Sequence, residues 1–201
     1  MDTEKIEIRK LLASKVPKVG EILFIAVDGH GGSGKSTFAT WLGKNLSAEV
    51  VRQDDFASWD NPLNWWPLVI EKVFTPIQNG SKTISYARSK WWENHNPEPV
   101  VDQPVTNQPV TNPMILEGVS SSRREFRDYI SLSIFVDTPE GLCLQRGIER
   151  DMSTGKTREE LTQIWNEYLK EENEYIERDQ PKIHADIVID GTRPFDSQID
   201  F

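Results

Sequence analysis

The chain has 201 residues, which suits one domain with a buried core, and 37% of them are hydrophobic while 27% are charged, as in globular proteins. Its formal net charge of -9 argues against nucleic acid as a partner, because nucleic-acid-binding proteins carry a basic face. The single cysteine, Cys143, excludes an intrachain disulfide and favours a reducing cytoplasm, and the longest apolar run, residues 22–27, is too short to span a membrane.

Strand and helix signals alternate along the chain. Residues 3–15 place apolar side chains among charges at helical spacing, which predicts a short amphipathic helix. Residues 21–27 form a β-branched and aromatic run that ends at Asp28-Gly29, as is typical of a buried strand. By the same criteria, further strands are predicted at 48–52, 114–117, 130–136 and 185–189, and further helices at 35–45, 67–77, 139–150 and 158–178.

The two helices after residue 138 carry additional signals. Thr138-Pro139 is typical of a helix start, with Thr138 as the N-cap and Pro139 at the first helical position. In the helix at 158–178, apolar side chains recur near helical spacing, so we expect them in the core: Leu161, Ile164, Trp165, Tyr168, Leu169 and Ile176.

Residues 56–113 are expected to form an insertion on the acceptor side of the site. Within it, residues 94–113 are rich in proline and contain a short duplication, which indicates a loop or an extended insertion, with a surface connector favoured. Aromatic residues gather between the second and third strands, where they form either the core of the insertion or a surface that stacks on a base. They are Phe56, Trp59, Trp65, Trp66, Tyr86, Trp91 and Trp92.

Strands that alternate with helices predict a three-layer α/β fold, with a five-stranded parallel sheet covered on both faces. Ligands bind such sheets at the carboxyl ends of the strands. Five acidic residues lie at or just after predicted strand ends, and we expect a site there: Asp28, Asp54, Asp55, Glu117 and Asp137.

A P-loop follows the first predicted sheet strand and opens a helix. Its pattern is Gly29, four residues, then Gly34-Lys35-Ser36. Glycines allow backbone N–H groups to curl around a phosphate, and the helix N-terminus adds partial positive charge. Lys35 can reach the β and γ phosphates, and Ser36 can ligate Mg²⁺. The motif predicts a P-loop NTPase fold that binds ATP through Gly29, Gly31, Gly32, Ser33, Gly34, Lys35, Ser36 and Thr37.

A kinase also needs carboxylates, one to deprotonate the acceptor hydroxyl and one to hold the metal. Asp54 and Asp55 follow the second predicted sheet strand and are both candidates for the base. Glu117 follows the third, where P-loop folds often carry a metal-linked acid, so we expect Ser36 and Glu117 to hold Mg²⁺.

Arginines provide the remaining positive charge. Arg146 and Arg150 are four residues apart and share a helix face, followed by a short polar stretch. This arrangement suits a small lid, residues 146–158, whose arginines stabilise charge on the transferred phosphoryl group. Arg123 and Arg124 are expected at the surface, and His30 is given no catalytic role.

These segments resemble the uridine kinase-like branch of the P-loop nucleoside kinases. The resemblance is carried, in the family's order, by residues 28–37, 53–56, 116–119, 135–138 with Arg146 and Arg150-Asp151, and 185–189. It implies that Asp54, or its neighbour Asp55, is the general base, that Glu117 helps to hold Mg²⁺, and that the two arginines belong to the lid. Residues 86–91 match the family pattern only loosely.

The prediction is therefore an ATP-dependent small-molecule kinase in a single P-loop kinase domain, residues 1–201. It transfers the γ-phosphoryl group to a hydroxyl, with a nucleoside as the leading acceptor. The alternatives are a kinase for a sugar, a vitamin or a nucleoside monophosphate, and a non-kinase nucleotide-binding protein. The oligomeric state stays open. A GTPase switch is disfavoured because the chain has no guanine-reading Asn/Thr-Lys-x-Asp motif.

Overall fold

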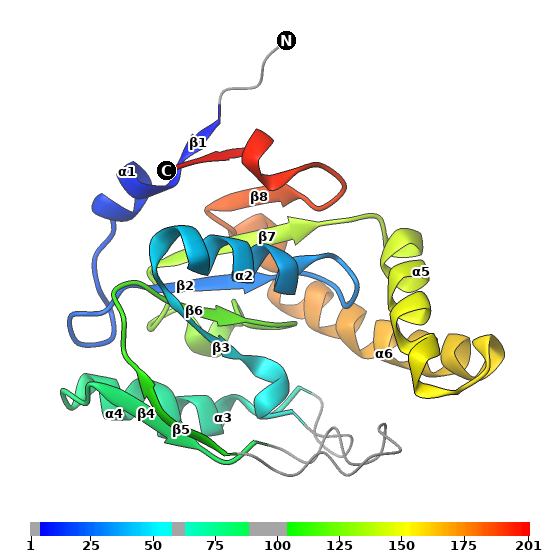
Figure 1. Cartoon of the computed structure of the whole chain (residues 1–201), viewed down its shortest axis with the longest axis horizontal. Coiled ribbons are helices and arrows are strands. Elements are labelled where there is room, and N and C mark those ends of the chain that lie inside the picture. The colour runs from blue at the N-terminus through cyan, green and yellow to red at the C-terminus, as the bar shows by residue number, and fades with distance from the viewer. Residues whose placement is uncertain (1–4, 58–62, 89–103) are drawn as a thin grey trace.

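A five-stranded parallel sheet lies at the centre of the molecule (Figure 1). The computed structural model describes residues 5–57, 63–88 and 104–201. The strand order is β3 (Glu49–Arg52), β6 (Met114–Glu117), β2 (Phe24–Asp28), β7 (Leu132–Asp137) and β8 (Ile187–Asp190). Every neighbouring pair is parallel, so all five carboxyl ends meet at one edge. The predicted sheet is confirmed.

The sheet is covered on both faces, as the side-chain alternation of β2 shows. Phe24 and Ala26 point into one apolar cluster, while Ile25 and Val27 point into another. The second cluster is closed by α1 (Ile8–Ala13) and α2 (Lys35–Leu46), and the first by α3 (Trp66–Val69) and α4 (Thr75–Gln78), which a π-helical turn over Ile70–Phe74 joins. The result is the three-layer α/β fold expected of a P-loop protein.

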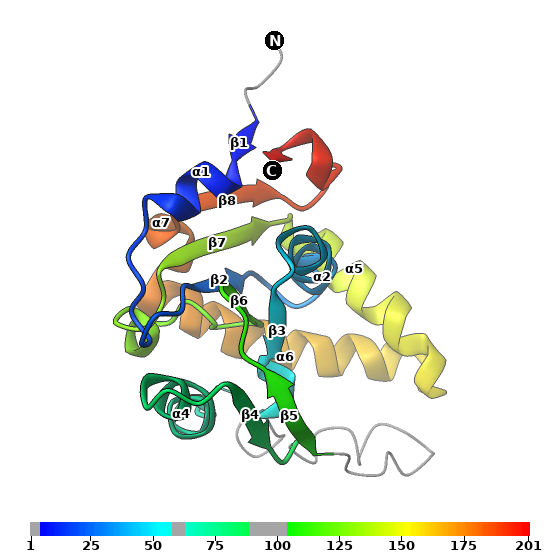
Figure 2. The ribbon, with the colours of Figure 1, turned by 60° about the vertical axis from the view of Figure 1, so that its left-hand side comes forward.

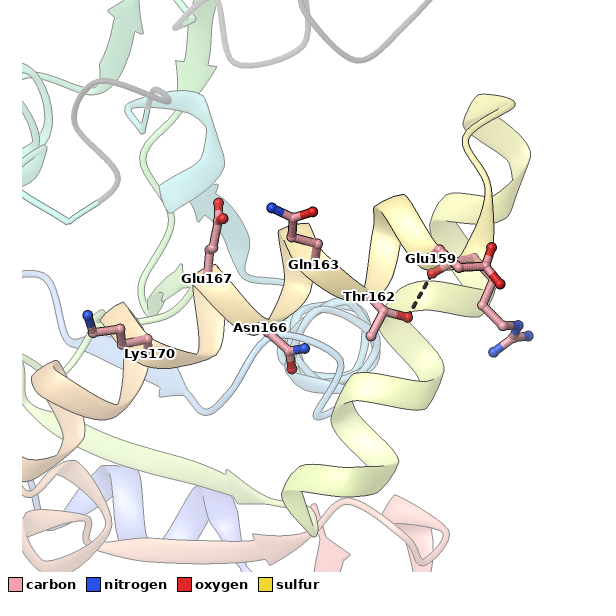
Figure 3. Close-up of a pocket in the computed structure, with 7 residues that line it drawn as sticks. Glu159, Thr162, Gln163, Asn166, Glu167 and Lys170 are labelled. Carbon is pink, nitrogen blue, oxygen red and sulfur yellow. Dashed lines mark hydrogen bonds between the residues drawn. The ribbon is translucent and has the colours of Figure 1, made fainter.

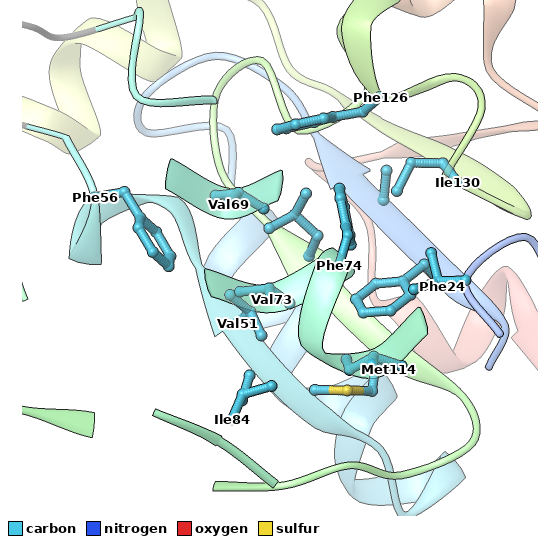
Figure 4. Close-up of a cluster of buried hydrophobic side chains, with 14 of the residues drawn as sticks. Phe24, Val51, Phe56, Val69, Val73, Phe74, Ile84, Met114, Phe126 and Ile130 are labelled. Carbon is cyan, nitrogen blue, oxygen red and sulfur yellow. The ribbon is translucent and has the colours of Figure 1, made fainter. Parts of the chain in front are cut away.

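The first cluster is the more aromatic of the two (Figure 4). The Phe74 ring lies edge-on to Phe24 and to Phe126, with ring centroids 5.0 and 5.4 Å apart. Each of these rings is fully buried and contributes roughly 1.5–3 kcal/mol relative to an exposed side chain. This packing fixes the helical segment 66–78 beneath the sheet, on the side of the predicted insertion.

The remaining elements form helices and two small separate sheets around the central one. Two of them, α5 (Glu140–Asp151) and α6 (Arg158–Asp179), form a helical hairpin beside the carboxyl ends of the strands, with α2 in front of the sheet and α6 behind it (Figure 1). After α7 (Pro181–His184) and β8, the C-terminal strand β9 (Ile199–Asp200) pairs in parallel with β1 (Ile6–Glu7), so the first and last described strands lie side by side (Figure 2). An antiparallel pair, β4 (Thr83–Tyr86) and β5 (Val105–Pro109), forms a small separate sheet.

The segment at 94–113 was predicted to be a loop or an extended insertion, and its residues 105–109 are extended, because β5 pairs with β4; residues 94–103 lie outside the described residues. Two other local predictions were wrong. The first predicted helix begins only at Ile8, because Ile6 and Glu7 pair with β9. Thr138 does not cap α5; Pro139 precedes the helix, and the Thr138 hydroxyl instead donates to the carbonyl of Ser33 at 2.8 Å.

The cap of α6 was not predicted. Thr157 and Glu160 form a capping box, in which each side chain accepts a backbone N–H of the other residue. Three of the six apolar residues expected in its core, Leu161, Trp165 and Leu169, are buried. Across the described ranges, no helix combines the length and the apolar character that crossing a membrane requires.

Candidate active site

The P-loop connects β2 to α2 at the centre of the sheet. Gly34, the residue before α2, has a φ of 96°, and no atom lies within 4 Å of the place where a Cβ would stand. No side chain caps α2, so its first-turn N–H groups and the positive end of its dipole are left without a side-chain acceptor. Lys35 is only 8% exposed, and its ammonium donates to the carbonyl of His30 at 3.2 Å. The loop is thus shaped and charged for an anion such as a phosphate.

Ser36 and Glu117 meet at the next strand end. Residue 117 ends β6, which pairs directly with β2, and the Ser36 hydroxyl donates to Glu117 Oε1 at 2.9 Å. Arg52, at the end of β3, donates to Glu117 Oε2 at 3.2 Å. A hydroxyl and a carboxylate side by side are hard oxygen donors that fit Mg²⁺, which in kinases takes one or two protein ligands and completes its shell with phosphates and water.

The electrostatics of Glu117 agree with such a role. Burial raises its pKa above the usual value, and the charge of Asp54 raises it further, while Lys35, Ser36 and Arg52 act in the opposite direction. The carboxylate is only 4% exposed, so its negative charge is held at a cost that a divalent cation would offset. Across the described residues there is no cluster of three or more metal-ligating side chains, so the protein alone offers no closed metal cage.

Asp54 and Asp55 lie in the 3₁₀ turn that follows β3, but their surroundings differ. Asp55 is 7% exposed; it accepts from the Tyr86 hydroxyl at 3.1 Å and pairs with Arg88 Nε at 3.0 Å. Asp54 is exposed, and its charge contributes to the raised pKa values of both Glu117 and Tyr168, although burial is the main cause in each. Asp54 is thus the exposed carboxylate of the pair, and Asp55 is the buried one.

The two predicted lid arginines are placed differently along α5. Arg146 donates to the carbonyl of Gly191, in the loop after β8, at 3.2 Å. Arg150 is mostly exposed; it donates to Asp151 at 2.7 Å and lies over the Trp165 ring at 5.4 Å. The charge of Asp54 is one of the influences that raise the Arg150 pKa, after the opposing effect of burial and the stronger effect of Asp151. Arg150 and Asp54 are therefore near enough to interact.

Two of the five strand-end acids do not join this group. Asp28 is 1% exposed, and its two oxygens accept from Gly29 N, Ser120 N, the Ser122 backbone and hydroxyl, and the Tyr175 hydroxyl, at 2.6–3.0 Å. This saturated carboxylate ties the P-loop to the loop after β6 and to α6. Asp137 pairs with Lys182 at the surface. The expectation of one five-acid site was wrong, because neither of these two carboxylates faces the P-loop opening.

Arg123 contradicts the expected surface placement. It is 1% exposed, donates to Glu125 at 2.8 Å and to the carbonyl of Leu63, and lies over the Trp66 ring at 5.6 Å. These contacts fasten the segment before α3 to the loop after β6. No sequence signal separates Arg123 from its exposed neighbour Arg124, since the burial arises from partners about 60 residues away.

The aromatic residues of the predicted insertion are largely core. Phe56, Trp65 and Tyr86 are buried in the first apolar cluster, and Trp66 packs against it. The three buried rings are therefore unavailable to stack on a base. Trp66 is only partly buried, and Trp59, Trp91 and Trp92 lie outside the described residues, so the base-stacking alternative stays a prediction for these four tryptophans.

An open groove of about 660 Å³ runs along the outer side of α6 (Figure 3). Glu167 points from the helix toward the turn that follows β3, while Asn166 points to the opposite side. The described residues that line the groove all come from α6: Arg158, Glu159, Thr162, Gln163, Asn166, Glu167 and Lys170. None of the predicted site residues lines the groove, so the site is better defined by the P-loop, Asp54 and Glu117.

Comparisons with known proteins identify the family of the chain. The family model of the phosphoribulokinase / uridine kinase family matches residues 69–196, more than half of the chain. The uridine kinase of Alkaliphilus metalliredigens (strain QYMF) is 29% identical over 175 residues, covering 73% of this chain and 76% of that protein. The uridine kinase of Pasteurella multocida (strain Pm70) is 23% identical over 198 residues, covering 83% and 85%.

A solved structure supports the same fold. It is described as a possible uridine kinase from Bacillus stearothermophilus, is 20% identical, and superposes with a TM-score of 0.61 over 90% of this chain and 94% of its own. The P-loop, the parallel sheet and the family match point to one conclusion. The chain belongs to the phosphoribulokinase / uridine kinase family.

Proposed function

We propose that this P-loop kinase uses ATP to phosphorylate a hydroxyl group of a small molecule, and that the acceptor is a nucleoside. ATP would lie with its phosphates on the loop at residues 29–37, and Mg²⁺ would be held by Ser36 and Glu117. When bound, Mg²⁺ would neutralise charge on the phosphates and orient them. Residues 146–158 would act as a lid over the donor, and residues 56–113 would supply the acceptor side.

The observation that carries the proposal is the 2.9 Å hydrogen bond from Ser36 to Glu117. It joins the start of α2 to the end of β6, segments that are 81 residues apart in sequence. A phosphate loop alone would fit any nucleotide-binding protein. Here the hydroxyl of Ser36 is paired with the buried carboxylate of Glu117 at the end of β6, and the exposed Asp54 follows β3, the strand beside β6. Together they would supply the metal ligands and the base that phosphoryl transfer to a hydroxyl requires.

The chemistry would proceed by in-line transfer. Asp54 would accept the proton of the acceptor hydroxyl as its oxygen forms a bond to the γ-phosphorus, and the bond from that phosphorus to the β-phosphate oxygen would break to release ADP. Lys35 and Arg150 would stabilise the charge that develops on the transferred group. Asp55, held by Tyr86 and Arg88, would position the turn rather than take part in the proton transfer.

The nucleoside assignment rests on the two uridine kinases that the chain resembles along most of its length. A panel of acceptors tests it: nucleosides, nucleoside monophosphates, sugars and vitamins, each with ATP·Mg²⁺ and with GTP·Mg²⁺. We expect a phosphorylated product from a nucleoside, and ATP to be the better donor. Product from a sugar or a vitamin alone would keep the kinase assignment and overturn the acceptor.

The same panel separates a kinase from a nucleotide-dependent switch. A switch releases inorganic phosphate at the same rate with or without an acceptor, whereas a kinase consumes ATP only as product forms. A Lys35→Met variant serves as the control, because it removes the ammonium from the loop without changing the length of the side chain greatly. We expect this variant to lose transfer to every acceptor.

A further inference from the structure

Besides Glu117 and Asp28, a third carboxylate touches the P-loop, and it comes from α6 rather than from a strand end. Glu172 is 7% exposed, and its Oε1 and Oε2 accept from the Gly31 N–H at 3.2 and 3.1 Å. The His30 ring, with Nδ1 3.1 Å from Oε2, donates to the same carboxylate. One buried side chain therefore holds two consecutive residues of the loop.

Trp165 forms the other half of this contact. A Cβ added at Gly31 would lie 2.8 Å from Trp165 Cζ3 and 2.9 Å from Glu172 Oε1, so the loop backbone is pressed between the two side chains. Residues 165 and 172 are seven apart, two helical turns, and thus share one face of α6. Trp165 also donates from its indole N–H to Asp151 at 3.0 Å and lies under Arg150.

The loop is thus held on one side and open on the other. His30 and Gly31 are fixed by α6, while the N–H groups that begin α2 have no side-chain cap. A carboxylate buried to this extent needs hydrogen bonds to offset its lost hydration, and within the described part of the chain those of Glu172 come from the P-loop. Hydrogen bonds to a charged acceptor are stronger than those to a neutral one.

We propose that Glu172 is a positioning residue for the phosphate donor. By holding His30 and Gly31, it sets the curvature of the loop so that the N–H groups after Gly31 converge on the terminal phosphates. The inference rests on the proposed function, since it assumes that the loop binds those phosphates. It predicts that removing the carboxylate weakens binding of nucleotides that place a phosphate in the loop and spares nucleotides that do not.

Calorimetric titration of ADP and of AMP into the nucleotide-free protein tests this. ADP carries a β-phosphate for the loop to bind, and AMP does not. Glu172→Ala should weaken ADP binding by about 10-fold to 100-fold, the loss expected when a charged hydrogen bond is removed, and leave AMP binding unchanged. Glu172→Gln should lie between wild type and Glu172→Ala, because its amide oxygen can still accept from Gly31.

Glu174→Gln is the matched control, because it removes the same charge from an exposed position on the same helix. It should bind ADP as the wild type does. If Glu172→Ala and Glu172→Gln bind ADP with wild-type affinity, or lose ADP and AMP binding equally, Glu172 does not position the loop. Failure of the wild-type protein itself to bind ADP would overturn the proposed function instead. If Glu172→Ala does not fold, the test rests on Glu172→Gln, which should bind ADP more weakly than the wild type does and bind AMP equally well.

Discussion

Asp54 and Asp55 are adjacent in sequence but differ in burial and in hydrogen bonding. Their carboxylates share one turn, yet Asp55 is buried against Tyr86 and Arg88 while Asp54 is exposed toward α6. From the sequence alone both are candidate bases, because nothing in the order Gln53-Asp54-Asp55-Phe56 shows which side chain turns inward. The 3₁₀ turn makes that choice, and it favours Asp54 as the group that meets the acceptor.

Asp54→Asn should lower kcat by roughly 100-fold to 10,000-fold, as expected for loss of a general base. The affinity for ATP should hold, because the P-loop is untouched. Asp55→Asn is the matched comparison; it should act mainly on the KM for the acceptor, since it loosens Arg88 and Tyr86. Steady-state kinetics with both substrates varied measure these effects. Full turnover by Asp54→Asn would rule it out as the base.

The buried charge of Glu117 is expected to lower the stability of the fold, although the proposed metal site needs it. Because burial raises its folded-state pKa, its contribution to stability is complete below the unfolded-state pKa and is lost as the pH rises through the folded-state pKa. Without nucleotide, Glu117→Gln should therefore have a higher free energy of unfolding than wild type at about pH 8, and the gap should narrow toward about pH 5. Urea unfolding at both pH values measures this.

The control for that experiment is Glu177→Gln, an exposed change on α6 that should follow the wild-type curve. The same Glu117→Gln variant should lose the Mg²⁺ dependence of ATP binding, since it replaces a carboxylate ligand by an amide. A variant less stable than wild type at the higher pH would show that the buried charge of Glu117 is not a cost to folding.

At the scale of elements, the hairpin of α5 and α6 connects the segment proposed as a lid to the P-loop. Arg150 projects from the end of α5 near Asp54, and α6 returns past Gly31. We predict that Arg150→Ala lowers kcat by roughly 100-fold, the cost of removing one group that stabilises the transferred charge, with little change in thermal midpoint because the side chain is mostly exposed. Glu149→Ala, one residue earlier and exposed, is the control. An unchanged kcat would remove Arg150 from the mechanism.

The elements of the sheet could be predicted because each signal is local. The apolar runs of β2, β6 and β7 and the glycine spacing of the P-loop lie within a few residues, so periodicity and motif suffice. By contrast, β5 contains Asn107 and Pro109 and is a strand only because β4 pairs with it. The burial of Arg123 and the contact of Glu172 with the loop depend in the same way on partners distant in sequence.

At the scale of the whole molecule, Asp28 connects three parts of the site. Its oxygens accept from the P-loop, from the loop after β6 and from Tyr175 of α6, so three segments distant in sequence share one buried carboxylate. Tyr175→Phe removes one of these donors and should lower the free energy of unfolding by about 1–3 kcal/mol, measured by urea denaturation. Tyr129→Phe, at a partly exposed ring stacked on Phe74, should change it far less. Equal effects would mean that the Asp28 network does not stabilise the fold.

The central claim is that the site transfers phosphate to an acceptor rather than to water. The most direct measurement follows γ-labelled ATP incubated with Mg²⁺ and uridine, for wild type and Asp54→Asn. With the wild-type protein, the label should move from ATP to a nucleoside monophosphate, and only when uridine is present. With the variant, the label should stay almost entirely in ATP. Label released as inorganic phosphate at one rate, whether or not uridine or any other acceptor is present, would contradict the assignment of a kinase.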